Sequence, residues 1–333
     1  MEVEWGDADA PRHEPDRPRP VDRGKGAIDG SGSDSDSDAE TETETETETE
    51  GVLADPERLA AEHQTYRAIV GRDYGSARDH WAEAIPELRG AWEKIKEKYG
   101  YEEHEGPTPP ADAGTWHGKG DRRLEAAQNE EIDRGYARIR EVGEQSIIPG
   151  VLSVEAEDPS RCLVGFDKRF KDADRLKEKV ADEIRSTPGT TPTQALAAVV
   201  DAVRVTYLYN ETEYTAGTRN DTERLKARGF VQVERRNTWT SDQYKGINAR
   251  WREPESDVLF EVQFHTQASF EAKELTHKAY ERIRSMTEET PEADREAAEL
   301  KEFQREVNAK IPIPPGATEY EDYRPERRDG RRD

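Results

Sequence analysis

The sequence has little of several residue types whose scarcity excludes whole classes of protein. A single cysteine, Cys162, among 333 residues rules out an internal disulfide and suits a reducing compartment. No run of about 18 apolar residues occurs, so no membrane span is predicted. The first residues also lack the basic-then-apolar pattern of a signal peptide. We therefore expect a soluble, cytoplasmic protein with no membrane partner.

Positive charge is also scarce. The chain has 50 Lys and Arg against 74 Asp and Glu, a formal net charge of −24. General DNA binding and binding to anionic membranes both need a positive surface, so this balance argues against both. The acidity fits either ordinary solubility or adaptation to high salt, and composition does not separate the two.

Several well-known catalytic motifs are missing. The sequence contains no HExxH, no CxxC, no GxxxxGK[ST] and no GxSxG. Zinc hydrolysis, thiol redox chemistry, a P-loop and a nucleophile elbow are therefore unsupported.

The chain divides into segments of contrasting composition. Residues 1–51 are a low-complexity acidic tail, predicted to be disordered because its Ser-Asp and Thr-Glu repeats have no apolar side chains to bury. Apolar residues at helical spacing predict a helical accessory segment over 52–100, and Pro and Gly predict a linker over 101–117. Strands that alternate with helices predict an α+β domain, a mixed β-sheet flanked by helices, over 118–290. An acidic helix and a Pro/Arg-rich tail complete the chain over 291–333.

Within the α+β domain, hydrophobic periodicity predicts individual elements. We expect a helix over 121–144, a strand-like stretch directly after Pro149-Gly150, and a helix over 172–186 that Asp172 or Asp174 caps. Trp81 and Trp92, in the accessory segment, are expected to be core or docking residues.

The segment FEVQFHT, residues 260–266, alternates strictly between apolar and polar residues. Its apolar side chains fall on one face of the predicted strand, and its polar side chains Glu261, Gln263 and His265 fall on the other. A carboxylate, an amide and an imidazole in register are typical of the wall of a polar pocket. An ordinary amphipathic edge strand would show the same alternation.

Basic residues are concentrated between residues 161 and 185 of this acidic chain. They are Arg161, Lys168, Arg169, Lys171, Arg175, Lys177, Lys179 and Arg185. Such a cluster favours a polyphosphate pocket, because phosphates need several positive charges and donor groups. The alternative is a solvated helix neutralised by neighbouring carboxylates, and charge alone does not decide between them.

Two carboxylates and one loop complete the set of candidate site residues. Asp201 and Glu261 lie at or near predicted strands, where hard oxygen ligands could hold magnesium together with the phosphates of a nucleotide, or could be ordinary strand-end charges. In the loop DQYKGIN, Tyr244 lies beside Lys245 and Asn248. Its ring could stack on a base or simply pack the loop.

Together these residues resemble the synthetase domain of the RelA/SpoT family, the alarmone pyrophosphokinases, over about residues 120–286. The family's R-x-K…S-x-x-x-K motif resembles RFKDADRLKEK, with Arg175 where the family usually has Ser. The motif D-x-x-R at the start of a strand is similar to DAVR, and the family's Gly-Tyr loop to QYKGIN. The strand motif E-x-Q-x-x-T and the closing helix are matched by Glu261, Gln263, Thr266, His277 and Tyr280.

Two departures point to a branch of that family. The chain reads YKGIN where housekeeping members read Y-x-S-L-H, and QFHT where they read Q-I-R-T. This combination resembles a divergent branch of small synthetases with toxin-like and adenosine-alarmone-forming members. No HD dipeptide occurs, so the family's hydrolase domain is not expected. An antitoxin or a regulatory protein is therefore a possible partner that controls the synthetase.

The resemblance implies a magnesium-dependent transfer of pyrophosphate from ATP to the 3′-hydroxyl of an acceptor nucleotide. Asp201 and Glu261 would be the catalytic and magnesium-binding residues. The implied ATP-binding residues are Arg169, Lys171, Arg175, Lys177, Lys179 and Arg204. The implied acceptor-binding residues are Tyr244, Lys245, Asn248, Gln263 and His265. The alternatives are a toxin that modifies the 3′ end of tRNA, an inactive nucleotide sensor, and an interaction protein that works through its N-terminal segments.

Overall fold

The computed structural model describes residues 75–101, 114–286 and 290–325. These belong to the second of the two units of the chain, Leu59–Asp333. The predicted acidic tail over 1–51 lies outside the described residues. None of the described helices combines the length and apolar character needed to cross a membrane.

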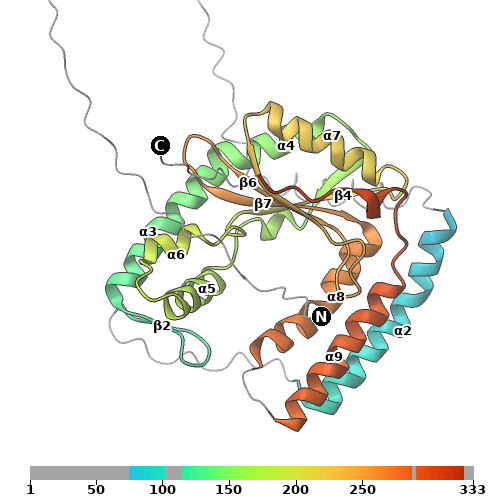
Figure 1. The fold of residues 1–333 in the computed structure, drawn as a ribbon, viewed down its shortest axis with the longest axis horizontal. Helices are drawn as coiled ribbons and strands as arrows, with labels where there is room; N and C mark the ends of the chain where they lie inside the picture. The colour runs from blue at the N-terminus through green and yellow to red at the C-terminus, as the bar shows by residue number, and fades with distance from the viewer. Residues whose placement is uncertain (1–74, 102–113, 287–289, 326–333) are drawn as a thin grey trace, which may run out of the picture. The chain divides into compact units, whose positions relative to one another are not determined.

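A five-stranded mixed sheet forms the centre of this unit, in the order β3-β4-β7-β6-β5. Strands β4 and β7 are parallel, and the other neighbours are antiparallel. Helices lie on both sides of the sheet, α4 (Ile148–Ala156) and α7 (Tyr214–Ala227) on one and α8 (Gln267–Ser285) on the other (Figure 1). The predicted α+β class with a mixed, helix-flanked sheet is confirmed. The strands are β3 (Arg161–Val164), β4 (Arg204–Tyr209), β5 (Val231–Asn237), β6 (Ile247–Arg252) and β7 (Leu259–Thr266).

The two faces of the sheet differ as the alternation of residues 260–266 predicts. On the face towards α4 (Ile148–Ala156) and α7 (Tyr214–Ala227), Phe260, Val262 and Phe264 are fully buried. Because tyrosines among them need partners for their hydroxyls, Tyr207 donates to the Val151 carbonyl of α4 at 2.7 Å. The opposite face carries the polar side chains described below.

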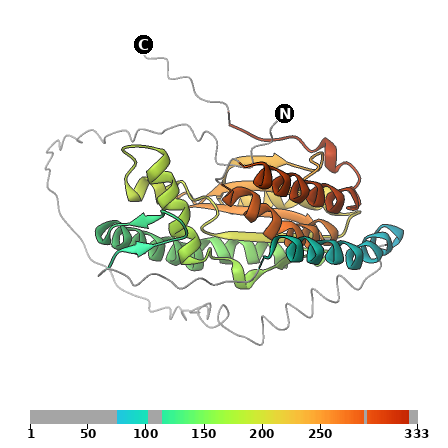
Figure 2. The same ribbon diagram turned by 90° about the horizontal axis from the view of Figure 1, so that it is seen from below.

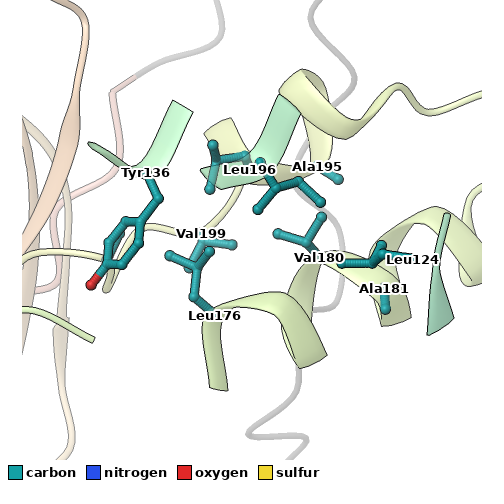
Figure 3. Close-up of a cluster of buried hydrophobic side chains, with 10 residues drawn as sticks. Leu124, Tyr136, Leu176, Val180, Ala181, Ala195, Leu196 and Val199 are labelled. Carbon is teal, nitrogen blue, oxygen red and sulfur yellow. The ribbon is translucent and has the colours of Figure 1, made fainter. Parts of the chain in front are cut away.

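A second core lies at one end of the sheet. There α3 (Ala126–Val142), α5 (Ala173–Ser186) and α6 (Pro192–Ala197) contribute to a cluster of buried hydrophobic residues that includes Leu124, Leu176, Val180 and Leu196 (Figure 3). Asp172 caps α5, because its carboxylate accepts from the N–H groups of residues 174 and 175. The predicted helix and cap are thus confirmed. They place the basic motif beside the start of β4.

The expected strand after Pro149-Gly150 is wrong. A π-helical turn, η1 (Gly143–Ile147), continues α3 directly into α4. Pro149 lies at the start of α4, directly after the π-helical turn, so the irregular hydrogen bonding of that turn accommodates its missing N–H. Gly150 is required by close packing, since a Cβ there would come within 2.6 Å of the ring of Phe230. The predicted helix over 121–144 begins only at Ala126, because β2 (Arg123–Leu124) pairs with β1 (Trp116–His117).

Three helices pack together at the other end of the unit (Figures 1 and 2). They are α2 (Gly75–Tyr99), α8 (Gln267–Ser285) and α9 (Pro291–Ala309). Trp92 of α2 stacks on Phe303 of α9 with centroids 5.5 Å apart. Trp81 donates its indole N–H to Glu271 of α8 at 2.9 Å, so both tryptophans are docking residues, as expected. The domain boundaries drawn from the sequence stay predictions.

The chain after α9 returns to the edge of the sheet. Arg235 of β5 and Tyr323 exchange two backbone hydrogen bonds of 2.8 and 2.9 Å. The Asn237 amide donates to the carbonyls of Ala317 and Tyr320, at either end of the short helix η3 (Ala317–Glu319). Residues 317–323 therefore cover the outer edge of β5.

Candidate active site

The polar face of the sheet is organised in rows that cross several strands. Register partners on neighbouring strands place Arg204, Glu261, Arg250 and Glu234 in one row across β4, β7, β6 and β5. Side chains opposite one another in such a row lie about 5 Å apart at Cβ. The row alternates in charge, and Arg250 contacts Glu234 at 3.0 Å. Glu261 therefore lies between two arginines.

The next row brings Gln263 beside Thr206 and Asn248. Gln263 is only 5% exposed, and its amide is bonded at both ends. Its Nε2 donates to Glu261 Oε1 at 2.6 Å, and its Oε1 accepts from Lys273 Nζ at 2.9 Å. A continuous set of hydrogen bonds thus joins α8 to the Glu261 carboxylate.

The loop before β6 closes over the end of this face. The Tyr244 hydroxyl donates to Asn248 Oδ1 at 2.9 Å and lies 2.9 Å from His265 Nε2. The other ring nitrogen of His265 lies 2.9 Å from Ser269 Oγ. Burial, aided by the charges of Lys273 and Arg204, holds the pKa of His265 well below its usual range, so the imidazole is neutral.

Gly246 makes this closure possible. A Cβ at that position would lie 2.7 Å from His265 Cε1, closer than side chains pack. The ring of Tyr244 stands edge-on to His265, with centroids 5.5 Å apart and planes at 86°. The Tyr244 hydroxyl therefore links two other predicted acceptor-side residues, Asn248 and His265.

Asp201 lies at the start of β4, between two lysines of the basic motif. Its carboxylate contacts Lys171 Nζ at 2.7 Å and Lys179 Nζ at 3.1 Å, and its side chain is 12% exposed. Burial alone would raise the pKa of Asp201, but Lys179 and Lys171 outweigh it and hold the pKa well below its usual range. Burial lowers the pKa of Lys171, against the opposing attraction of Asp201.

Backbone pairing explains how the motif reaches this position. Phe170 and Val203 form an antiparallel bridge, with Arg204 N donating to Arg169 O at 2.8 Å and Lys171 N to Ala202 O at 3.0 Å. Glu261 N donates to Val203 O at 2.9 Å from the other side. The basic motif, the start of β4 and the Glu261 end of β7 therefore meet at one place.

Arg169 lies at the same end, held by aromatic and acidic neighbours. Its guanidinium lies 4.8 Å from the ring centre of Phe166 and 5.2 Å from that of Phe170. Glu144, from the π-helical turn, accepts from its Nη2 at 3.0 Å. Its buried Nε has no hydrogen-bond partner within the part of the chain that the structure describes.

The structure places three predicted site residues in other contacts. Lys177 is buried against α3, where it contacts Asp133 at 2.7 Å. Arg175 bridges Glu178 and Glu281 at the surface, at 3.3 Å each. The buried Lys245 ammonium donates to loop carbonyls of residues 239 and 241. These three are not brought onto Asp201 or onto the row of Glu261.

The structure also places on this face a basic residue that no sequence motif indicates, Lys273 of α8. Its side chain is 15% exposed and reaches the polar face over Gln263. Burial and the nearby Arg204 lower the pKa of Lys273 to about 8. The signal available in the sequence is its spacing, since Phe270, Lys273 and His277 recur at helical intervals.

The carboxylates suit a hard cation such as Mg²⁺. Oxygen ligands are what this ion prefers, and Asp201 is held ionised. Over the described ranges, no group of three or more His, Cys, Asp or Glu side chains is arranged to hold a metal ion. Asp201 and Glu261 would hold such an ion together with phosphate oxygens of a nucleotide.

Comparisons with known proteins identify similar structures but no family. No family model and no curated protein matches this chain. The complex between the Type VI effector Tas1 and its immunity protein matches with 13% identity and a TM-score of 0.37, covering 54% of this chain and 97% of that chain. Small alarmone synthetase 1 from Bacillus subtilis, bound to its product pppGpp, matches with 17% identity and a TM-score of 0.36, covering 54% of this chain and 94% of that chain.

A GTP pyrophosphokinase family protein from Streptococcus pneumoniae also matches, with 12% identity and a TM-score of 0.27, covering 55% of this chain and 87% of that chain. The Bacillus subtilis and Streptococcus pneumoniae proteins bear names of the class of synthetase that the sequence motifs resemble. At TM-scores below 0.5 they carry no functional weight. The function of this chain is therefore inferred from its own residues.

Proposed function

We propose that the chain is a nucleotide pyrophosphokinase that uses ATP as donor. The observation that supports it best is the meeting of the Asp201–Lys171–Lys179 triad with the Glu261 row at the start of β4. This arrangement offers positive charge for a triphosphate beside a carboxylate that can accept a proton. A solvated basic helix would not need a buried carboxylate at its centre.

The reaction joins the 3′-oxygen of the acceptor to the β-phosphorus of ATP. The bond between that phosphorus and the oxygen that bridges it to the α-phosphate breaks, and AMP leaves with the bond's electrons. The 3′-hydroxyl proton passes to the Glu261 carboxylate, the proposed general base. When bound, Mg²⁺ would neutralise charge on the phosphates.

On the donor side, Lys171, Lys179, Arg169 and Arg204 are proposed to bind the phosphates. Asp201 holds the two ammonium groups at one point, so a triphosphate would meet charges that are already positioned. Arg175 lies at the surface and could join them by a change of side-chain conformation. Lys177 we propose to brace α5 against α3 through Asp133.

On the acceptor side, Tyr244, Asn248, Gln263 and His265 are proposed to line the pocket. Lys245 would shape it from behind by fixing the loop carbonyls. Because both ring nitrogens of the buried, neutral His265 already have partners, we propose that it supports the pocket by holding Tyr244 in place. Base-edge hydrogen bonds, and not stacking, would discriminate between purines.

We propose an adenine nucleotide as the preferred acceptor, on the resemblance of KGIN and QFHT to the adenosine-alarmone branch. Transfer to the 3′ end of tRNA is the second candidate, favoured by the terminal adenosine there and disfavoured by the net charge of −24. Because the sequence has no HD dipeptide and no hydrolase of its own is expected, we propose that an inhibitory protein partners this chain.

The test is a competition assay with the purified full chain, [γ-³²P]ATP and equal amounts of ATP, GTP and uncharged tRNA. We expect a labelled adenine nucleotide that carries pyrophosphate on its 3′-oxygen, distinct from the ATP donor, and an equal amount of AMP. No such product should form when magnesium is chelated. Mainly guanosine product would refute the adenine preference, and labelled tRNA alone would establish the toxin-type reaction. Saturable ATP binding without AMP release would refute the proposed enzyme activity and indicate an inactive nucleotide sensor.

A further inference from the structure

Lys273 holds a position on the polar face that no motif explains. It lies in the second turn of α8, and its ammonium reaches down to Gln263 Oε1 at 2.9 Å. The ammonium also lies 5.2 Å from the ring centre of Phe270 and 3.7 Å from Glu274. A lysine side chain that is 15% exposed is uncommon unless its contacts compensate for burial.

The ammonium determines which way the Gln263 amide points. A protonated lysine only donates hydrogen bonds, so the amide oxygen must face it and the amide nitrogen must face away. Thr206 Oγ1 favours the same orientation, because it donates to the same oxygen at 3.4 Å. In this orientation Nε2 donates to Glu261 Oε1 at 2.6 Å. The reversed amide would set nitrogen against the ammonium and oxygen against the carboxylate, two repulsive contacts.

We propose that Lys273 is a positioning residue of the transfer reaction, which acts through Gln263 to fix the orientation of the Glu261 carboxylate. With Oε1 held by the amide, Oε2 is the oxygen left to take the proton of the 3′-hydroxyl. The inference rests on the proposed function, because it assigns Lys273 a role in that same site.

Charged and titratable groups surround Lys273 on each element that packs against it. Arg204 approaches from β4, Glu261 and His265 from β7, and Glu274 and His277 from α8 itself. Burial and Arg204 lower the pKa of Lys273 to about 8, while Glu274 and Glu261 oppose them. Above that pH the neutral amine carries a lone pair, so the strongest of the contacts that orient the Gln263 amide is weakened and only Thr206 and Glu261 still favour one orientation.

The test compares K273M, K273Q and K273R in the full chain across pH 6.5–9.5, with K301M, on the exposed face of α9, as the matched control. For K273M we expect kcat to fall about 10- to 100-fold with little change in the KM for ATP, the size typical of residues that orient a ligand from behind. K273Q, which keeps a donor, should lose less. Arginine stays charged, so K273R should remain active above pH 8, where the wild type declines.

A second measurement does not depend on catalysis. The side-chain ¹⁵N–¹H signals of Gln263, assigned with Q263E, should shift with a midpoint near pH 8 in the wild type and should not titrate in K273M. Wild-type kcat in folded K273M, or Gln263 signals that do not titrate in the wild type, would overturn the role of Lys273. A wild type that transfers nothing would refute the proposed function instead. The titration of the Gln263 signals would still show whether the Lys273 ammonium contacts the Gln263 amide.

Discussion

The triad of Asp201 with Lys171 and Lys179 can be tested through its contribution to folding. In D201N, an amide of almost the same volume replaces the carboxylate, and the two ammonium groups lose their shared counter-ion. The three side chains are 12%, 16% and 25% exposed, so water would compensate only in part. The two lysines would then repel each other across the amide.

The loss of unfolding free energy that we expect for D201N lies between two known limits. Breaking a fully buried ion pair costs about 3–5 kcal/mol, and an exposed pair contributes about 0–1 kcal/mol. For this mostly buried triad we expect D201N to lower the free energy of unfolding by about 2–3 kcal/mol at pH 7, within the stability of a typical domain. The variant should therefore fold, and its transfer activity should fall by about a hundredfold or more.

The contribution of Asp201 to stability should fall as the pH is lowered. The pKa of Asp201 is depressed in the folded protein, so its contribution is complete above the unfolded pKa of about 3.9 and is lost as the pH falls below that value. The difference between wild type and D201N should be full at pH 7 and smaller below about pH 4.

Urea denaturation followed by far-ultraviolet circular dichroism, at pH 7 and at pH 3.5, measures this difference. The matched control is D257N, which alters an ion pair with Arg252 whose aspartate is 77% exposed, and it should change stability by less than about 1 kcal/mol. A D201N variant as stable as D257N at pH 7, or a difference that does not change with pH, would refute the account of the triad.

Three further predictions concern the rest of the site and the N-terminal segment. E261Q should reduce transfer about a hundredfold or more without loss of ATP binding. The control E255Q, on the exposed turn before β7, should leave transfer unchanged. Equal turnover of the two variants in the radiolabel assay would contradict the assignment of Glu261 as the base. G246A should displace His265, cost about 1–3 kcal/mol in urea denaturation, and raise the KM for the acceptor more than that for ATP; an unchanged KM would count against the acceptor pocket. Removal of residues 1–51 should leave turnover unchanged at fixed salt, because that sequence has almost no apolar side chains to pack; a large loss would show that the tail shapes the site.

Patterns with a fixed geometric period predicted the sheet well. Strict alternation over 260–266 predicted both faces of β7, because a period of two leaves no freedom in which side chain points where. Asp172 was likewise predicted as the cap of α5, and the resemblance implied one site for Lys171, Lys179 and Asp201. The structure adds that the two lysines form ion pairs with the aspartate.

Contacts between distant segments could not be predicted in the same way. The Pro149-Gly150 pair is typical of a break in structure, yet a π-helical turn and the Phe230 ring make it part of a helix. Whether a lysine of the basic motif faces phosphate or an aspartate depends on the neighbouring helix, as Lys177 shows. Lys273 could be recognised only once α8 was seen to lie over Gln263.

The segment over 317–323 has a consequence for how copies of this chain behave in solution. An uncovered β5 would present a row of free N–H and C=O groups, on which a second molecule could add a strand. Hydrogen bonds from Tyr323 and the packing of Arg235 on the Tyr320 ring, 4.4 Å from its centre, occupy that edge within one molecule. A chain shortened before Ala317 would keep every proposed catalytic side chain and yet expose this edge, so its failure in an assay would report association of copies through β5 and not lost chemistry.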